Sequence, residues 1–186
     1  WTEAKGLAEN LTYYGLQGYL VTILSEEENQ IAAVQTNDVG WIGASDFGNE
    51  GDWRWVTGPE ASYDNESGLP FWSGDENGSP TIDPNSGEEM YSNWNDIGPL
   101  EPNDYGDGSG TENYAHVTAP GIGEIGDWND LPNVTPSSGN YQAKGYIVEF
   151  GGMPDDPELN LSSSTNLLAP FVEINVFNAC ANEFTG

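Results

Sequence analysis

Apolar residues in the first forty positions alternate between helical and strand-like spacing. Four of them recur at the i, i+3, i+4, i+7 spacing of an amphipathic helix: Ala4, Leu7, Ala8 and Leu11. Gly15 and Gly18 follow and are expected to end that helix. The β-branched and aromatic run 19–23 predicts a strand. Ser25 and Glu28 then form a capping box, which predicts a second helix through Val34.

Regular patterns become short after residue 44. The run 41–44 predicts a buried strand, and shorter strand-like pieces occur at 53–56, 114–117 and 145–150. Between them, residues 45–132 are rich in Gly, Asp, Asn and aromatic residues. A long irregular stretch within one domain is usually functional, and its tryptophans need a packed environment. Such loops need a cross-link, and we expect a metal ion to supply it.

The segment 151–157 combines turn residues with no apolar period, which predicts a domain boundary. We therefore expect one domain over residues 1–152, and a linker with the start of a β-rich module over residues 153–186. In that second part, Val172, Ile174 and Val176 alternate as a strand would. The chain opens without an initiating Met or a signal peptide, so we expect it to be part of a longer protein.

Composition narrows the possible partners. Thirty-one acidic residues face only three basic ones, which gives a formal charge of −28. That charge repels nucleic acid and anionic membrane surfaces. Seven Trp, nine Tyr and six Phe nevertheless predict a folded core. Solubility in a saline exterior explains many carboxylates equally well. Cys180 is the only cysteine, so an intrachain disulfide is excluded, and no apolar run approaches the roughly 20 residues that cross a membrane.

Oxygen-rich side chains cluster in three loop segments, around Glu101–Asp104, at Glu112 and at Asn129–Asp130. Calcium binds six to eight oxygen ligands of these types. The same set suits a sugar, because two adjacent hydroxyls could complete the calcium shell. Each hydroxyl would accept a hydrogen bond from an Asn amide and donate one to a carboxylate. Glu101, Asn103, Glu112 and Asn129 supply the two pairs that this scheme needs.

These motifs, with Trp1–Ala4, the helix pair, Trp41–Gly43 and Trp128, resemble the C-type lectin-like domain over residues 1–152. The resemblance implies an α+β fold with two helices, short antiparallel sheets and a long loop region cross-linked by calcium. The Glu-Pro-Asn form goes with mannose-type sugars in that family. Carried over, the primary calcium ligands are Glu101, Asn103, Glu112, Asn129 and Asp130. The four that contact sugar are Glu101, Asn103, Glu112 and Asn129.

The resemblance also implies a cis peptide bond before Pro102. An auxiliary calcium site would use Asp46, Glu50 and Asp104, with Glu112 between the two ions. Three features depart from the family. Its disulfide cysteines are absent, its first strand would precede Trp1, and the segment 60–90 is long. Without that first strand, we expect the edge at 147–149 to be unpaired and open to a strand from elsewhere.

Several readings compete with a lectin site. His116, the only histidine, is expected to be structural, and Trp94 and Trp128 are expected to pack in the core. Carboxylate pairs cleave glycosides in some enzymes, but no pair here has separated roles, so we expect no enzyme. The phrases 68–74 and 151–154 resemble modules of large surface adhesins of Bacteroidetes-type bacteria, which implies a secreted or cell-surface protein. The main alternative is a protein-binding module in which calcium is only structural.

Overall fold

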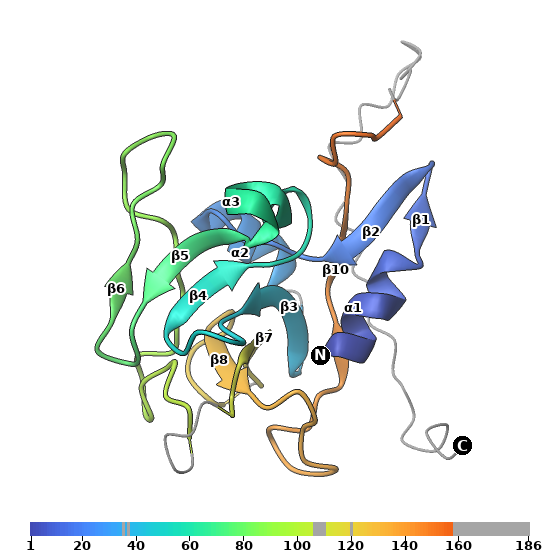
Figure 1. Cartoon of the computed structure of the whole chain (residues 1–186). Helices are drawn as coiled ribbons and strands as arrows, with labels where there is room; N and C mark the ends of the chain where they lie inside the picture. Colours follow the sequence, from blue (N-terminus) through green and yellow to red (C-terminus); the bar gives the residue numbers. More distant parts are fainter. Residues whose placement is uncertain (35, 37, 106–110, 120, 158–186) are drawn as a thin grey trace.

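A computed structural model describes residues 1–34, 36, 38–105, 111–119 and 121–157 (Figure 1). Two mainly antiparallel sheets and short helices form an α+β domain, as the sequence predicts. Figure 1 shows the sheets side by side, with α1, β1 and β2 at one end and β4, β5 and β6 at the other. The predicted strand residues 172, 174 and 176 and Cys180 lie outside the described residues.

The N-terminal elements follow the apolar pattern, but both helices end earlier than predicted. The first ends at Glu9, before Leu11 and well before Gly15 and Gly18, and the second ends at Ala32 and not at Val34. Helix α1 (Thr2–Glu9) buries Ala4 and Ala8, and the hairpin β1 (Thr12–Tyr13) and β2 (Leu16–Leu20) follows it. Helix α2 (Glu26–Ala32) begins where the capping box predicts it, because the Ser25 side chain accepts a hydrogen bond from the Glu28 amide.

The strand predicted at 19–23 begins earlier than expected and ends at Leu20. Residues beyond it remain buried but leave the small sheet. The Val21 amide donates to the Ile147 carbonyl at 3.0 Å, and the Gly43 amide donates to the Val21 carbonyl at 2.8 Å. The chain therefore passes from one sheet to the other at this point instead of extending one ladder.

The larger sheet contains the strands that carry the predicted site. Its order is β6-β5-β4-β3-β7-β8, and β9 pairs with β3 in parallel. The strands of the first half are β3 (Gly40–Ser45), β4 (Asp52–Trp55), β5 (Leu69–Ser73) and β6 (Ser79–Pro80). Those of the second half are β7 (Tyr114–Val117), β8 (Trp128–Leu131) and β9 (Gly145–Tyr146). Between β4 and β5 lie a 3-10 turn (Pro59–Ser62) and the short α3 (Tyr63–Glu66).

The region 45–132 is more regular than its composition suggests. Strands β5 and β8 both lie within it, and α3 adds a third helical segment to the two predicted. Pro70 made a strand at 69–73 hard to foresee, since proline cannot donate to a ladder. The register between β4 and β5 shifts between Trp53 and Arg54, and this irregularity accommodates Pro70 opposite Arg54.

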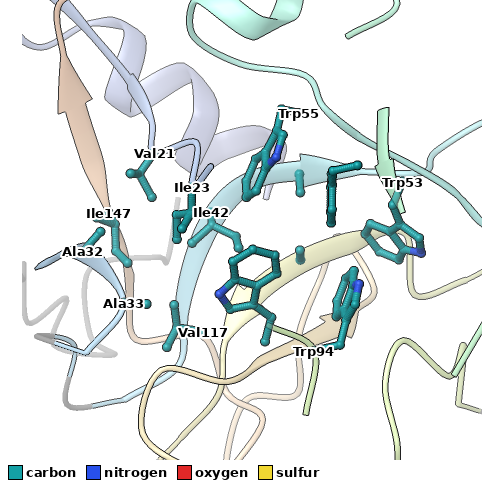
Figure 2. Close-up of a cluster of buried hydrophobic side chains, with 14 of the residues drawn as sticks. Val21, Ile23, Ala32, Ala33, Ile42, Trp53, Trp55, Trp94, Val117 and Ile147 are labelled. Atoms are coloured by element: carbon teal, nitrogen blue, oxygen red, sulfur yellow. The ribbon is translucent and has the colours of Figure 1, made fainter. Parts of the chain in front are cut away.

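Tryptophans contribute much of the core, and Figure 2 shows Trp53, Trp55 and Trp94 among its buried side chains. The Trp55 and Trp128 rings meet edge to face at 5.5 Å between centroids, and Trp53 meets Trp94 in the same way at 4.8 Å. Trp94 and Trp128 also form a parallel β-bridge. The prediction that both residues pack in the core is confirmed, and Trp128 fixes the backbone next to Asn129 and Asp130.

The segment predicted as one strand at 145–150 is divided. Strand β10 (Val148–Phe150) pairs antiparallel with β2, while the Ile147 amide donates to the Trp41 carbonyl at 3.0 Å. One side of the 147–149 segment is therefore paired with β2 and β3. In the described part of the chain, β10 is still the outer strand of the three-stranded sheet. None of the described helices is long and apolar enough to cross a membrane.

Candidate functional site

The loop 101–104 is anchored to β8 through its backbone. The Glu101–Pro102 bond is cis, which confirms the prediction. The amides of Asn103 and Asp104 donate to the two oxygens of the Asp130 carboxylate, at 3.1 and 2.9 Å. Strand β8 contributes Asp130 from the buried ladder that it forms with β7, so a carboxylate of the sheet sets the position of the Glu-Pro-Asn loop.

Two further carboxylates close the loop that follows. The Tyr105 amide donates to Glu112 Oε2 at 2.6 Å. In return, Asp104 Oδ1 accepts from the amides of Thr111 and Glu112, at 2.7 and 3.0 Å. These reciprocal hydrogen bonds bring Glu112 next to the Glu-Pro-Asn segment.

Asp46 and Glu50 follow the end of β3 on the same side of the site. Asp46 Oδ2 accepts from the Gly51 amide at 2.8 Å, and the Asp46 amide donates to the Asn113 carbonyl at 3.3 Å. Asn113 also donates from its side chain to Glu50 Oε2 at 3.5 Å. This residue, which sequence reasoning missed, therefore joins the predicted auxiliary pair to the segment that carries Glu112.

Burial and mutual repulsion raise the pKa of most carboxyl groups in this cluster. Burial, followed by the nearby Asp130 and Glu112, raises the pKa of Glu101 to about 10. Burial and Asp130 raise the pKa of Glu112 to about 7, and burial raises the pKa of Asp130.

The auxiliary residues belong to the same electrostatic cluster. Burial raises the pKa of Asp46 to about 6, with Asp130 adding to the effect. Partial burial, with Asp46 and Asp104 nearby, raises the pKa of Glu50 to about 7. The structure thus brings together all six predicted carboxylates. Hereafter we call this set the acidic cluster: Asp46, Glu50, Glu101, Asp104, Glu112 and Asp130.

Positive side chains of the protein do not neutralise the buried part of the acidic cluster. In the described chain, the ion pairs join Lys5 to Glu9, and Arg54 to Asp52 and Asp64. No Lys or Arg of the described residues pairs with the four buried carboxylates Asp46, Glu101, Glu112 and Asp130. Buried carboxylates without a counter-charge are costly, so they must take up protons or a cation.

The oxygens of the site fit a calcium ion. Glu101 Oε2, Asn103 Oδ1 and Asp46 Oδ1 are buried and accept no hydrogen bond from a described donor. Such oxygens are the hard ligands that calcium prefers. No three His, Cys, Asp or Glu side chains among the described residues form a metal site by themselves in this arrangement. The fit therefore depends on the mixed set, in which Asn103 and Asn129 add amide oxygens to the carboxylates.

Asn129 lies opposite His116 across the β7–β8 ladder. Its Nδ2 atom contacts His116 Nε2 at 2.9 Å and donates to the Asp130 carbonyl at 2.6 Å. His116 is fully buried, and burial lowers the pKa of its imidazole to about 4. The expectation of a structural histidine agrees with this burial, but sequence reasoning missed its contact with a predicted ligand.

Two tyrosines near the site were also missed. The Tyr141 side chain is partly buried, and after burial itself the charges of Glu101 and Glu112 raise its pKa. Tyr105 follows the motif directly and is 81% exposed. Its position directly after Asp104 in the sequence was enough to place it near the site. Tyr141 lies eleven residues after Asp130 in a Gly- and Ser-rich loop, where no spacing marks it.

Comparison with known proteins identifies the fold family. Residues 12–130, which carry the loop 101–104, Glu112 and Asn129–Asp130, match the family model of the lectin C-type domain. The chain belongs to the C-type lectin domain family. The α+β architecture of this lectin domain is therefore the C-type lectin fold that its motifs predict.

Relatives of this lectin domain include much longer proteins. Halomucin of Haloquadratum walsbyi (strain DSM 16790 / HBSQ001) is 42% identical over 154 residues, or 82% of this chain, but the match spans 1% of halomucin. C-type lectin domain family 4 member M of Gorilla gorilla gorilla is 38% identical over 85 residues, which cover 44% of this chain and 21% of that protein.

Among solved structures, the mouse scavenger receptor C-type lectin carbohydrate-recognition domain superposes with a TM-score of 0.44 at 25% identity. The superposition covers 70% of this chain and 72% of the mouse domain. The C-type lectin CEL-I from Cucumaria echinata gives a TM-score of 0.43 at 21% identity, with 80% of each chain covered.

Proposed function

We propose that this lectin domain binds a mannose-type sugar through a calcium ion held in the acidic cluster. The proposal rests on one observation: four buried carboxylates lie together with no Lys or Arg partner among the described residues. Family membership favours a carbohydrate as the ligand. The primary calcium ligands we propose are Glu101, Asn103, Glu112, Asn129 and Asp130.

A second calcium ion is proposed beside the first. Asp46, Glu50 and Asp104 would bind it, and Glu112 would bridge the two ions. Glu50 is the exposed member of this group, and its pKa is raised first by partial burial and then by repulsion from Asp46 and Asp104. A divalent cation would relieve that repulsion.

The sugar would contact both the ion and its ligands. Bound calcium supplies open coordination positions for two adjacent sugar hydroxyls. Glu101 and Glu112 would accept hydrogen bonds from those hydroxyls, and Asn103 would donate one. Asn129 already donates from Nδ2 to His116 and to the Asp130 carbonyl, so its donation to a hydroxyl would require one of these bonds to be exchanged. Few sugar atoms would be buried, so we expect an affinity of about 1 mM for one monosaccharide.

The biological setting we propose is adhesion by a secreted or cell-surface protein. The domain would occupy residues 1–152, and residues 153–186 would lead into a further module. Several copies of a weak site in one molecule would give useful avidity. The narrower likeness to Bacteroidetes-type adhesins rests on the phrases 68–74 and 151–154 alone. No catalytic role is assigned to the carboxylates. A strand from elsewhere in the parent protein would pair with the outer edge of β10.

Retention on immobilised mannan tests this function. We expect the native chain to be retained in calcium and released by a chelator. The variant Glu101→Gln/Asn103→Asp should lose retention or change its sugar preference. A matched control, Glu76→Gln/Asn77→Asp, makes the same changes in an exposed loop and should be retained like the native chain. Unchanged mannan retention by the site variant would refute the assignment of these residues.

The alternative is a protein-binding module whose loops are ordered by calcium. The acidic cluster is compatible with this function, because its carboxylates need a cation whether or not a sugar follows. A calcium-dependent rise in melting temperature without retention on any glycan would favour that alternative. Hydrogen exchange in loops 45–51 and 95–105 should slow with calcium under either function.

A further inference from the structure

The Asn129 side chain is held from two directions. Its Nδ2 atom lies 2.9 Å from His116 Nε2 and 2.6 Å from the Asp130 carbonyl oxygen. The carbonyl accepts hydrogen bonds only, so the atom that faces it must be the amide nitrogen and not the amide oxygen. Asn129 Oδ1 is therefore the amide atom that neither of these two contacts uses.

The contact of the second ring nitrogen of His116 determines the tautomer of the neutral ring. Nδ1 lies 2.8 Å from the Val117 carbonyl oxygen, which again only accepts. Nδ1 must consequently carry the hydrogen, and in the neutral ring Nε2 is then an acceptor. An acceptor at Nε2 is what the Asn129 N–H requires, so all the contacts agree on one tautomer and one amide orientation.

The imidazole itself has little freedom to move. His116 is fully buried and forms a direct cross-strand pair with Asn129 in the β7–β8 ladder. The Trp41 ring meets it edge to face, with 5.9 Å between centroids and an interplanar angle of 90°. A rigid ring at this place defines the Asn129 rotamer through the sheet.

We propose that His116 is a positioning residue that orients the Asn129 amide so that Oδ1 faces the calcium site. This inference rests on the proposed function, because Asn129 Oδ1 is one of the proposed ligands. It also implies that Asn103, and not Asn129, is the principal amide donor to the sugar. His116 thus influences both calcium affinity and the direction from which a hydroxyl is recognised, without contacting either ligand.

Calcium affinity of three variants tests the proposal. His116→Leu removes the acceptor, and we expect calcium binding, measured by calorimetry, to weaken about tenfold or more. His116→Gln keeps an acceptor and a donor on a planar amide, and should return the affinity to within about a factor of three of the native value. Val117→Ala is the matched control: it creates a cavity in the same strand and should lower the melting temperature in chelator without changing calcium affinity.

Each contrary result has a distinct meaning. Equal affinity in the native chain and His116→Leu overturns the positioning role alone. Equal weakening in all three variants shows a purely structural effect and also overturns it. Failure of the native chain to bind calcium overturns the proposed function together with this inference.

A spectrum without calcium gives a second, independent test. His116 is the only histidine, so one imidazole contributes to the long-range ¹H–¹⁵N spectrum. In chelator at pH 7 we expect the neutral Nδ1–H tautomer. A neutral ring protonated at Nε2, or one that exchanges between the two tautomers, would refute the proposed orientation of Asn129.

Discussion

Replacing Glu101 by Gln should have opposite effects on stability with and without calcium. Glu101 is 5% exposed beside Asp130, and burial raises its pKa from 4.5 to about 10 when no cation is bound nearby. The folded chain then binds a proton at pH 7 that the unfolded chain does not. A carboxyl pKa that is higher in the folded state lowers stability as pH rises from 4.5 towards 10. Gln carries no charge and avoids this loss.

The size of the effect follows from the shift. At pH 7, the pH exceeds the unfolded pKa of 4.5 by 2.5 units, which corresponds to roughly 3 kcal/mol of lost stability at about 1.4 kcal/mol per unit. This is an upper limit, because Gln does not reproduce every contact of the protonated carboxyl. For a domain of this size, it corresponds to a rise in melting temperature of roughly 6–12 °C. The difference should vanish below pH 4.5, where Glu101 is protonated in both states.

Thermal unfolding in chelator and in calcium, at fixed ionic strength and at pH 4 and 7, provides the assay. At pH 7 in chelator, Glu101→Gln should be more stable than the native chain. In calcium, the native chain should be more stable than the variant, because the variant lacks one charged ligand. Glu76→Gln removes a charge from an exposed loop and serves as the control, with little change expected in either buffer. If Glu101→Gln were less stable than the native chain in chelator at pH 7, the electrostatic reasoning would be wrong.

Three further predictions concern the scaffold. Asn29→Ala should lower the free energy of unfolding, measured by urea denaturation, by about 1–3 kcal/mol, because Asn29 Oδ1 accepts a hydrogen bond from buried Trp128 Nε1 at 2.9 Å. A loss under about 0.5 kcal/mol would contradict this. Gly43→Ala should lower the free energy of unfolding by about 1–3 kcal/mol or more, because a Cβ there would lie 1.9 Å from Thr57 Oγ1. Gly6→Ala, where a Cβ would enter open space on a helix, should raise it slightly. Equal effects of the two substitutions would refute the packing argument. Raising the salt concentration from 0.1 M to 1 M shortens the screening length from about 10 to about 3 Å. Because the formal charge is −28, weaker repulsion between carboxylates should raise the melting temperature. A melting temperature that does not change with salt would show that this repulsion is unimportant.

Local patterns predicted the fold where one residue type determines the backbone. Ser25 starts α2 through its own side chain, and the apolar run at 41–44 became the central strand β3. The ends of elements depended on contacts distant in sequence. Val21 leaves its strand because Ile147 and Gly43 bind its backbone, and no pattern within 19–23 records those partners. Pro70 concealed β5 because its accommodation depends on a register shift opposite Arg54.

For the site, residue chemistry identified the members but not their supports. The six carboxylates were recognisable as oxygen ligands, and the structure places them in one cluster. Asn113 and His116 were not recognisable, because each acquires its role only from residues distant in sequence: Asn113 contacts Asp46 and Glu50, and His116 contacts Asn129. His116 faces Asn129 through the β7–β8 register, which is a property of the folded ladder.

Calorimetric titration of the chelator-treated chain with calcium, with and without saturating methyl α-mannoside, tests the central claim most directly. If one ion binds both the acidic cluster and the sugar, the two affinities are linked, and each ligand must strengthen the other by the same factor. We therefore predict calcium binding that becomes tighter in the presence of the mannoside, while methyl β-galactoside has a smaller effect. Calcium affinity that is unchanged by any sugar, or no calcium binding at all, would contradict this account.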